Sequence, residues 1–307
     1  MGIESEWIWM DGAWVPFGEA QVHVLSHTLH YGLGAFEGIR AYTQPDGRAG
    51  IWRLDEHLQR LLRSLSMAHL SCPWGVEELH EVCLQTLERN HFTEAYLRPL
   101  AFLGTGAMGL GARGNPLHMV VAAWAWGAYL GEEGLAKGVK LRTSSFQRNH
   151  PNAALARAKI VGHYVNSILA RYEANDDGFD EALMLDGRGF VAEGTGENVF
   201  VVHDGVVITP EPVNILPGLT RSSVIEILQH EGIEIREQSI TRDAFYTADE
   251  AFMCGTAAEV TPIASLDRRT IGDGRPGEVT RRVQDLYTRG VRGQVDWLAQ
   301  HISQLTR

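Results

Sequence analysis

A lysine among small and apolar neighbours is the residue of this sequence best suited to covalent chemistry. Lys159 lies in the stretch Ala158-Lys159-Ile160-Val161-Gly162-His163 and is followed, five residues later, by Tyr164. Desolvation favours the neutral form of an amine, and only the neutral amine attacks a carbonyl. The pattern therefore indicates a site at which a lysine bonds an aldehyde cofactor. A solvated surface lysine at the start of a helix is the alternative that the same residues allow.

A second chemical group is the carboxylate of Glu193, which opens the stretch Glu193-Gly194-Thr195-Gly196-Glu197-Asn198. A bend this rich in glycine is too tight for a solvated helix face. A carboxylate held there could keep a pyridine nitrogen protonated, as a cofactor that acts as an electron sink requires. A polar turn without a ligand is the alternative.

Two small-residue turns offer groups that bind phosphate. Leu216-Pro217-Gly218-Leu219-Thr220-Arg221 leads into a helical pattern, where free N–H groups, a hydroxyl and the positive end of the helix dipole coincide. Gly255-Thr256-Ala257-Ala258 follows an apolar strand pattern, and its amides could hold a phosphate or a carboxylate. Each turn alone is also compatible with an ordinary capped helix or an ordinary loop.

The first half of the chain carries the signals of a sheet covered by helices. Asp11-Gly12 and Gln44-Pro45-Asp46-Gly47 predict hairpins, because these residues favour tight turns. Strand character is found over 95–100 and 119–124. One helix is expected to begin at Asp55 and a second to span 76–88. The first helix has an apolar stripe made of Leu58, Leu61, Leu62 and Leu65.

Strands and helices interleave in the second half. Glycines at 127, 131, 134 and 138 precede it and indicate a linker. Beyond this linker, helices are predicted over 161–175 and 220–231. A strand is predicted over 181–185, and a hairpin joins 198–202 to 206–209.

Composition narrows the functional classes. The 307 residues fit two domains, and the hydrophobic fraction of 44% predicts a folded protein. A formal net charge of −11 argues against nucleic acid and membrane surfaces as partners. Cys72, Cys83 and Cys254 lack metal-ligand spacing, so we expect no metal site and a cytoplasmic location. We also expect no secretion signal, since residues 1–6 are acidic and lack a basic-then-apolar leader, and no membrane span, since the longest apolar run covers only 119–126.

The order of these motifs resembles that of the class IV (fold-type IV) pyridoxal-phosphate aminotransferases. Three further stretches look like the branched-chain amino acid aminotransferases within that family. They are His30-Tyr31-Gly32-Leu33-Gly34-Ala35-Phe36-Glu37-Gly38-Ile39-Arg40-Ala41-Tyr42, Tyr96-Leu97-Arg98-Pro99-Leu100 and Trp126-Gly127-Ala128-Tyr129-Leu130-Gly131. The resemblance runs from about Trp7 to about Gly274.

The resemblance implies an α+β fold of two domains. Residues 1–127 would form a smaller N-terminal α/β sandwich, and residues 128–137 an interdomain loop. Residues 138–307 would form a larger C-terminal pseudo-barrel domain that binds pyridoxal 5′-phosphate. A homo-oligomer is also implied, either a dimer or a hexamer that is a trimer of dimers.

The resemblance gives each motif a role at the cofactor. Lys159 would be the catalytic residue, which bonds the aldehyde and then moves a proton between the substrate Cα and the cofactor C4′ carbon. Tyr164 would hydrogen-bond the phenolic oxygen, and Glu193 would pair with the ring nitrogen. The phosphate would be held by Arg60, by Thr220 and Thr256, and by the amides of Leu219 and Thr220. A solvated charge on the leucine-striped helix is the alternative for Arg60.

The resemblance also implies one substrate pocket for a branched apolar side chain and for the second carboxylate of glutamate. The apolar walls would be Tyr31, Phe36, Trp126, Tyr129 and Leu110, the last reaching in from a partner subunit. The α-carboxylate would bind the amides of Thr256 and Ala257 and the hydroxyl of Tyr96. The glutamate side chain would bind Arg40 and Arg98. Because one methylene changes binding by only about 1–3 kcal/mol, leucine, isoleucine and valine should all be accepted.

The expected activity is transfer of the amino group of L-leucine, L-isoleucine or L-valine to 2-oxoglutarate. Two half-reactions would pass through pyridoxamine phosphate, with amino acids and 2-oxo acids as the small-molecule partners. The alternatives are a D-amino-acid or (R)-amine transaminase or an aminodeoxychorismate lyase of the same fold. A non-catalytic carrier of pyridoxal phosphate is an alternative of another class.

Overall fold

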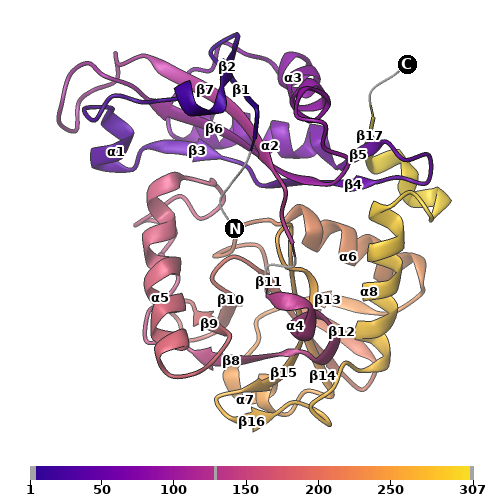
Figure 1. The fold of residues 1–307 in the computed structure, drawn as a ribbon. Coiled ribbons are helices and arrows are strands. Elements are labelled where there is room, and N and C mark those ends of the chain that lie inside the picture. The colour runs from indigo at the N-terminus through magenta and orange to yellow at the C-terminus, as the bar shows by residue number, and fades with distance from the viewer. Residues whose placement is uncertain (1–4, 128–129, 305–307) are drawn as a thin grey trace. The chain divides into compact units, whose positions relative to one another are not determined.

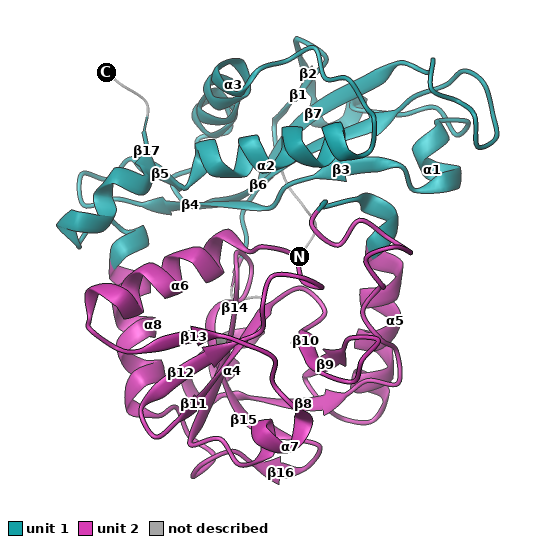
Figure 2. Cartoon of the chain, turned by 180° about the vertical axis from the view of Figure 1, so that it is seen from behind, with its two compact units in different colours: residues 1–126, 158–163, 290–307 teal, residues 127–157, 164–289 magenta. Residues whose placement is uncertain are grey.

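A computed structural model describes residues 5–127 and 130–304 (Figure 1). These residues fall into two units. Unit 1 contains the described residues of 1–126, 158–163 and 290–307, and unit 2 contains those of 127–157 and 164–289 (Figure 2). All eight tryptophans of the sequence belong to unit 1. Tryptophan fluorescence therefore reports on unit 1.

Unit 1 is built on an antiparallel sheet. Its strands are β1 (Trp7–Met10), β2 (Ala13–Pro16), β3 (Gly34–Phe36), β4 (Ile39–Thr43), β5 (Ala49–Trp52), β6 (Ala95–Leu103), β7 (Leu117–Trp124) and β17 (Ile302–Ser303). They follow the order β17-β5-β4-β6-β7-β1-β2, and β3 also pairs with β6. Because β3 and β4 pair with different parts of the same strand, Glu37 and Gly38 lie between them within the sheet.

Two long helices supply the apolar side chains that cover this sheet. The helices of unit 1 are η1 (Phe17–Glu19), α1 (His27–Tyr31), α2 (Leu54–Met67), α3 (Val76–Arg89), η2 (Val161–His163) and η3 (Asp296–His301). Leu58, Leu61 and Leu65 of α2 recur at helical spacing and are fully buried. They join one hydrophobic cluster with Leu79 of α3 and with strand residues such as Ile39.

Unit 2 is built on a mixed sheet. Its strands are β8 (Val139–Thr143), β9 (Glu181–Leu185), β10 (Val191–Glu193), β11 (Asn198–His203), β12 (Val206–Thr209), β13 (Ile235–Glu237), β14 (Glu250–Gly255), β15 (Glu259–Leu266) and β16 (Arg269–Thr270). The order is β10-β9-β8-β15-β14-β11-β12-β13, with β16 on β15. β8 is parallel to β9 and to β15, and β12 is parallel to β13.

Helices provide the crossovers that parallel strands require. The helices of unit 2 are α4 (Gly131–Lys137), α5 (Tyr164–Asp176), α6 (Leu219–His230), α7 (Arg242–Tyr246) and α8 (Glu278–Val291), the last of which ends in unit 1. In chain order α5 lies between β8 and β9, and α6 between β12 and β13. Ala170 and Ala174 of α5 pack closely on Ala182 and Met184 of β9, since alanines allow a short approach.

The hairpins predicted from the sequence are confirmed. β1 and β2 meet at Asp11-Gly12, whose φ angles of 50° and 92° are those of a type I′ turn. The β4–β5 and β11–β12 hairpins are also present. The predicted cap at Asp55 is wrong, because α2 begins at Leu54 after Arg53, which has a left-handed φ of 50° and makes no side-chain cap.

Part of the segment expected as an interdomain loop, 128–137, is helical. Residues 131–137 form α4, and Gly134 has a packing role in it, because a Cβ there would come within 3.0 Å of Val139. The division into domains at 1–127 and 138–307 stays a prediction. The grouping of the described residues differs from it in that 158–163 and 290–304 belong to unit 1.

Candidate active site

The backbone around Lys159 is hydrogen-bonded to the rest of unit 1 at several points. The Lys159 N–H donates to Ser64 Oγ at 3.0 Å, and the Phe36 N–H donates to the Lys159 carbonyl at 3.2 Å. The Gly162 N–H donates to the Gly32 carbonyl at 2.9 Å. A Cβ on Gly32 would lie only 2.9 Å from Gly162 Cα, so this contact needs glycine. The segment 158–163 therefore functions as an edge of unit 1.

The amine of Lys159 lies over an aromatic ring. Its Nζ is 5.1 Å from the centroid of Phe36, and the residue is half-buried. A lysine with its backbone fixed and its amine on an aromatic face is not the freely solvated lysine of the alternative interpretation. The arrangement suits an amine that must reach one target reproducibly.

Arg60 of α2 lies in a buried ionic cluster. Its Nε and Nη2 donate to the two carboxylate oxygens of Glu37 at 2.7 and 2.8 Å, and His57 Nδ1 lies 2.7 Å from Glu37 Oε2. Glu37 is 0%, His57 2% and Arg60 6% exposed. The alternative of a solvated helix charge is therefore wrong for Arg60.

Opposing effects act on the protonation of this cluster. Burial alone would raise the pKa of Glu37, but Arg60 and His57 together lower the pKa well below its ordinary value. Burial lowers the pKa of His57 in spite of the opposite effect of Glu37. Glu37 is therefore an anion, and its charge is balanced chiefly by Arg60.

Aromatic rings and guanidinium groups share one region of unit 1. Tyr96 stacks on Trp126 with ring centroids 4.9 Å apart. Arg98 Cζ lies 4.6 Å from the centroid of Phe36 and 5.4 Å from that of Tyr96. A Cβ at Gly38 would lie 1.8 Å from Tyr96 Oη, so the tyrosine hydroxyl can occupy this position only because residue 38 is glycine.

The other predicted pocket residues of unit 1 differ in exposure. Arg40 is buried, and its Cζ lies 5.1 Å from the centroid of Tyr42. Tyr31 is exposed and its ring packs on His27. Leu110 is 93% exposed. Tyr129 lies outside the described residues.

In unit 2, Glu193 ends β10 and is buried among donors. Arg148 Nη2 is 2.6 Å from Glu193 Oε1, and Asn198 Nδ2 donates to Oε2 at 3.1 Å. The Leu216 N–H also donates to this carboxylate, at 3.2 Å to Oε2. A guanidinium and two amides thus fix the orientation of Glu193, which is 5% exposed. The bend is a built carboxylate site and not a solvated polar turn.

Two more carboxylates are buried in the same part of unit 2. Glu181 is 0% and Glu197 3% exposed. Glu181 accepts from the Thr195 hydroxyl at 2.8 Å and pairs with Arg171. The Gly196 N–H donates to Glu197 at 3.0 Å. Burial, followed by the charge of Glu181, raises the pKa of Glu197 to about 8.

The residues of unit 2 that are predicted to bind phosphate lie at two turns of the chain. α6 begins at Leu219 with no side-chain cap from Gly218, and Thr220 is buried. The first N–H groups of a helix have no acceptor within it, so they suit an anion. Thr256 and Ala257 lie in the turn that joins β14 to β15, and Tyr164 is the first residue of α5.

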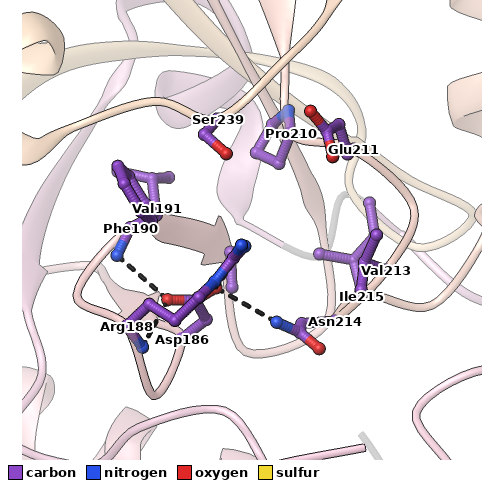
Figure 3. Close-up of a pocket in the computed structure, with 11 residues that line it drawn as sticks. Asp186, Arg188, Phe190, Val191, Pro210, Glu211, Val213, Asn214, Ile215 and Ser239 are labelled. Carbon is purple, nitrogen blue, oxygen red and sulfur yellow. Dashed lines mark hydrogen bonds and ion pairs between the residues drawn. The ribbon is translucent and has the colours of Figure 1, made fainter.

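Figure 3 shows a small cavity of unit 2 beside Asp186, Arg188 and Asn214. Asn214 Nδ2 donates to Asp186 Oδ2 at 3.0 Å across it. Its volume of about 20 Å³ is enough for one water molecule and far too small for a cofactor. We therefore interpret it as a small gap beside the Asn214–Asp186 hydrogen bond and not as a cofactor site.

Metal-ligand clusters and membrane-crossing helices are both absent from residues 5–127 and 130–304. The side chains of histidine, cysteine, aspartate and glutamate in these ranges form no group of three suited to a metal ion. None of the helices within the same ranges has both the length and the apolar character that crossing a membrane requires.

Several residues that hold the site were missed from the sequence. Ser64 and Arg148 gave no signal, since nothing nearby in the chain marks their partners. Glu37 and Glu197 did give one: each is an acidic residue within an otherwise small or apolar motif. Such a residue has to be paired, or to be neutral, if it is buried.

Known proteins resemble this chain along nearly its whole length. The family model Amino-transferase class IV matches residues 34–266. A branched-chain-amino-acid aminotransferase of Pseudomonas aeruginosa is 48% identical over 289 residues, which cover 94% of each chain.

Solved structures agree with this match. The crystal structure of the Escherichia coli branched-chain amino acid aminotransferase has a TM-score of 0.96 and 40% identity, covering 99% of this chain and 100% of that one. The T.th. branched-chain amino acid aminotransferase complexed with N-(5′-phosphopyridoxyl)-L-glutamate has a TM-score of 0.95 and 44% identity over the same shares. The α+β fold expected from the sequence is thereby confirmed.

Proposed function

This chain belongs to the class IV aminotransferase family, and we propose that it transfers the amino group of L-leucine, L-isoleucine or L-valine to 2-oxoglutarate. The names of its relatives support this activity, since the similar Pseudomonas aeruginosa protein is a branched-chain-amino-acid aminotransferase. Glutamate is the expected partner amino acid because the T.th. enzyme has been solved with a phosphopyridoxyl-L-glutamate.

The donor set of this chain fits pyridoxal 5′-phosphate, the cofactor of the family. A phosphate dianion needs cations and free N–H groups, which Arg60 and the uncapped start of α6 offer. A ring nitrogen needs a carboxylate, and Glu193 is one with a fixed orientation. When bound, the cofactor supplies an aldehyde that takes up the amino group and a ring that accepts the electron pair of the substrate Cα–H bond.

We assign the proton transfers to Lys159. Its Nζ would remove the proton from the substrate Cα and deliver it to the carbon that receives it, as a general base and then a general acid. The contacts of its backbone with Ser64 and Phe36 limit the volume that the amine can sample. Positioning of this kind contributes to rate because the reacting atoms meet without further ordering.

In unit 2 we assign binding and orientation. Glu193 would hold the proton of the ring nitrogen, and Tyr164 would donate its hydroxyl to the phenolic oxygen. The N–H groups of Leu219 and Thr220, with the hydroxyls of Thr220 and Thr256, would bind phosphate. Arg148 would keep Glu193 in one orientation through the 2.6 Å ion pair.

One observation supports the dual substrate best. Arg98 lies over Phe36 and Tyr96, so the same region offers apolar surface to a branched side chain and a guanidinium to a carboxylate. Arg40 and Trp126 would extend the two kinds of surface. Tyr31, Tyr129 and Leu110 remain proposed wall residues, with Leu110 serving a partner's pocket. The Tyr96 hydroxyl, with the amides of Thr256 and Ala257, would bind the α-carboxylate.

The central test is a Lys159→Ala variant. We expect the purified protein to be yellow, and the variant to lose both the visible absorbance and the turnover of L-leucine with 2-oxoglutarate. Reduction with borohydride followed by mass spectrometry should find the adduct on Lys159. A variant that keeps full activity, or an adduct on another residue, would refute the proposal.

The alternatives on the same fold differ in stereochemistry. Assays with L-leucine and D-alanine should give turnover with the L-amino acid, and turnover of D-alanine alone would favour a D-amino-acid transaminase. A carrier that binds cofactor without catalysis would fail to convert it to the amine form in a single turnover with L-glutamate.

The assembly and location are also proposals. We propose a homodimer or a hexamer made of three dimers, as the family resemblance implies. We also propose a cytoplasmic enzyme, in keeping with the three free cysteines. Light scattering on the purified chain would decide between a monomer, which would contradict the proposal, and the two assemblies.

A further inference from the structure

Glu37 is the buried residue of unit 1 whose position needs most explanation. It lies between β3 and β4, and its N–H donates to the Pro99 carbonyl of β6 at 2.8 Å. Its side chain meets Arg60 and His57 of α2. The carboxylate is fully buried. The proposed chemistry gives it no role.

We propose that Glu37 and His57 are positioning residues, which orient the guanidinium of Arg60 toward the cofactor phosphate. This inference rests on the proposed function, in which Arg60 is a phosphate ligand. Glu37 accepts from Nε and Nη2 in a two-point contact, and so it fixes the plane of the guanidinium. His57 contacts the same Glu37 oxygen as Arg60 Nη2 and so limits rotation of the carboxylate.

Stability alone does not explain this cluster, because a buried ion pair is often no more stabilising than apolar residues of the same volume. Orientation does explain it, since a planar guanidinium binds phosphate well only when its N–H groups face the oxygens. An unsupported arginine would have to be ordered at each binding event, at a cost in affinity. The Glu37 carboxylate removes that cost by ordering Arg60 before the ligand arrives.

A second contact ties the cluster to the proposed catalytic lysine. Ser64, one turn after Arg60 on α2, donates its hydroxyl to the Arg60 carbonyl at 2.8 Å and accepts from the Lys159 N–H at 3.0 Å. The same turn of α2 thus determines the position of both Arg60 and the Lys159 backbone. Arg60 and the Lys159 backbone are therefore positioned by the same element, α2.

The test separates phosphate recognition from folding. Cofactor is removed from the full-length chain, and the dissociation constants of pyridoxal 5′-phosphate and of pyridoxal, which lacks the phosphate, are measured by absorbance. The ratio of the pyridoxal constant to that of pyridoxal 5′-phosphate reports the contribution of the phosphate. General damage to the fold weakens both ligands and leaves this ratio unchanged.

Glu37→Gln should lower the ratio about 10–100-fold, by analogy with the loss that follows when a residue that orients a metal ligand is removed. The control is Glu56→Gln, which removes an ion pair with Arg53 from the same helix at 3.0 Å and should leave the ratio unchanged. An unchanged or higher ratio in Glu37→Gln would overturn the inference, because it would mean that the carboxylate only neutralises Arg60.

Arg60→Lys separates this inference from the proposed function. If Arg60→Lys leaves the ratio unchanged, the proposed phosphate contact of the Arg60 guanidinium is wrong, because lysine offers phosphate a point charge without the planar fork. If Arg60→Lys lowers the ratio and Glu37→Gln does not, only the positioning role is wrong. If Glu37 and Arg60 act on the phosphate through the same guanidinium, adding Glu37→Gln to Arg60→Lys should lower the ratio no further. If their roles are independent, the free-energy effects of the two substitutions should add.

His57→Phe, which keeps a ring but has no donor, covers the case in which Glu37→Gln does not fold. This variant leaves the Arg60–Glu37 pair intact and removes only the lateral support of the carboxylate. It should lower the ratio in the same direction and by less than Glu37→Gln. A ratio equal to that of the unmodified chain would overturn the inference.

Discussion

Glu37 in unit 1 and Glu197 in unit 2 are both almost completely buried, yet their surroundings drive their protonation in opposite directions. Glu37 has Arg60 on two of its hydrogen-bonding positions and His57 on a third. Glu197 receives an N–H at 3.0 Å and is affected by the carboxylates of Glu181 and Glu193. Glu37 and Glu197 are buried to nearly the same extent, but the charges beside them differ.

The charges that surround a buried carboxylate determine what it can be used for. With cations beside it, Glu37 has a lowered pKa and acts as a fixed anion that orients a guanidinium. With burial and anions acting on it, Glu197 has a pKa raised to about 8 and carries a proton at neutral pH. The structure thus contains one buried carboxylate that is anionic, Glu37 in unit 1, and one that is protonated and neutral, Glu197 in unit 2.

The largest expected effect comes from removing the cation of the first site. Arg60→Met leaves Glu37 buried without its main partner, which should cost about 3–5 kcal/mol in the free energy of unfolding. Urea unfolding followed by tryptophan fluorescence reports on unit 1, where all eight tryptophans lie. Adding Glu37→Gln should recover much of this loss, because the uncompensated charge disappears.

Arg48→Met is the matched control for this prediction. Arg48 also pairs with a carboxylate in unit 1, that of Asp46 at 2.6 Å, but these side chains are 40% and 44% exposed. We expect little change in its unfolding curve. Equal losses in Arg48→Met and Arg60→Met would remove the distinction between a buried and an exposed pair.

The next effect concerns the pH dependence of unit 2. The folded state holds the proton of Glu197 up to about pH 8, whereas the unfolded chain releases it near the ordinary carboxyl value of 4.5. Stability from this group is therefore complete below 4.5 and is lost as pH rises to about 8, by at most about 1.4 kcal/mol per pH unit. Glu197→Gln does not titrate, so its free energy of unfolding should fall less over this range.

Urea unfolding from pH 4 to pH 9, followed by circular dichroism and by hydrogen exchange in β11, would measure this difference. The two proteins should diverge between the two pKa values and run parallel above the higher one. Parallel curves throughout would mean that Glu197 is ionised in the folded protein, like Glu37.

The smallest predicted effect tests the hydroxyl that supports the neighbouring carboxylate. Thr195 donates to Glu181 at 2.8 Å and is buried. Thr195→Val removes the donor with little change in shape and should cost about 1.5–3 kcal/mol, as for hydrogen bonds to charged groups. Thr195→Ser keeps the donor and should cost less. Equal losses in the two variants would assign the effect to packing.

Local signals in the sequence predicted much of the fold. The Asp11-Gly12 turn and the leucine stripe of α2 each depend on residues close together in the chain, and both are present. The helix α4 was missed because its glycines look like a linker, whereas Gly134 packs on Val139. The start of α2 was missed because Arg53 enters it through a left-handed turn that no residue preference marks.

The site was predicted in part for the same reason. Lys159 and Glu193 stand in unusual local contexts, so the sequence marks them. Their supports come from distant positions: Ser64 lies 95 residues from Lys159, and Glu37 lies 23 residues from Arg60. Which acidic residue meets which arginine is determined by strand pairing and helix packing, and no single stretch of sequence contains that information.

The interrupted course of unit 1 also bears on how the chain is made. Its strand β5 receives β17 only after residues 164–289 have passed, and residue 160 pairs back to residue 35. During synthesis, residues of unit 1 are therefore made both first and last. Its sheet lacks the segment 158–163 and the strand β17 until these later residues have been made. Long-range closures of this kind are slow, so the sheet of the nascent N-terminal part keeps an unpaired edge until the later residues have been made.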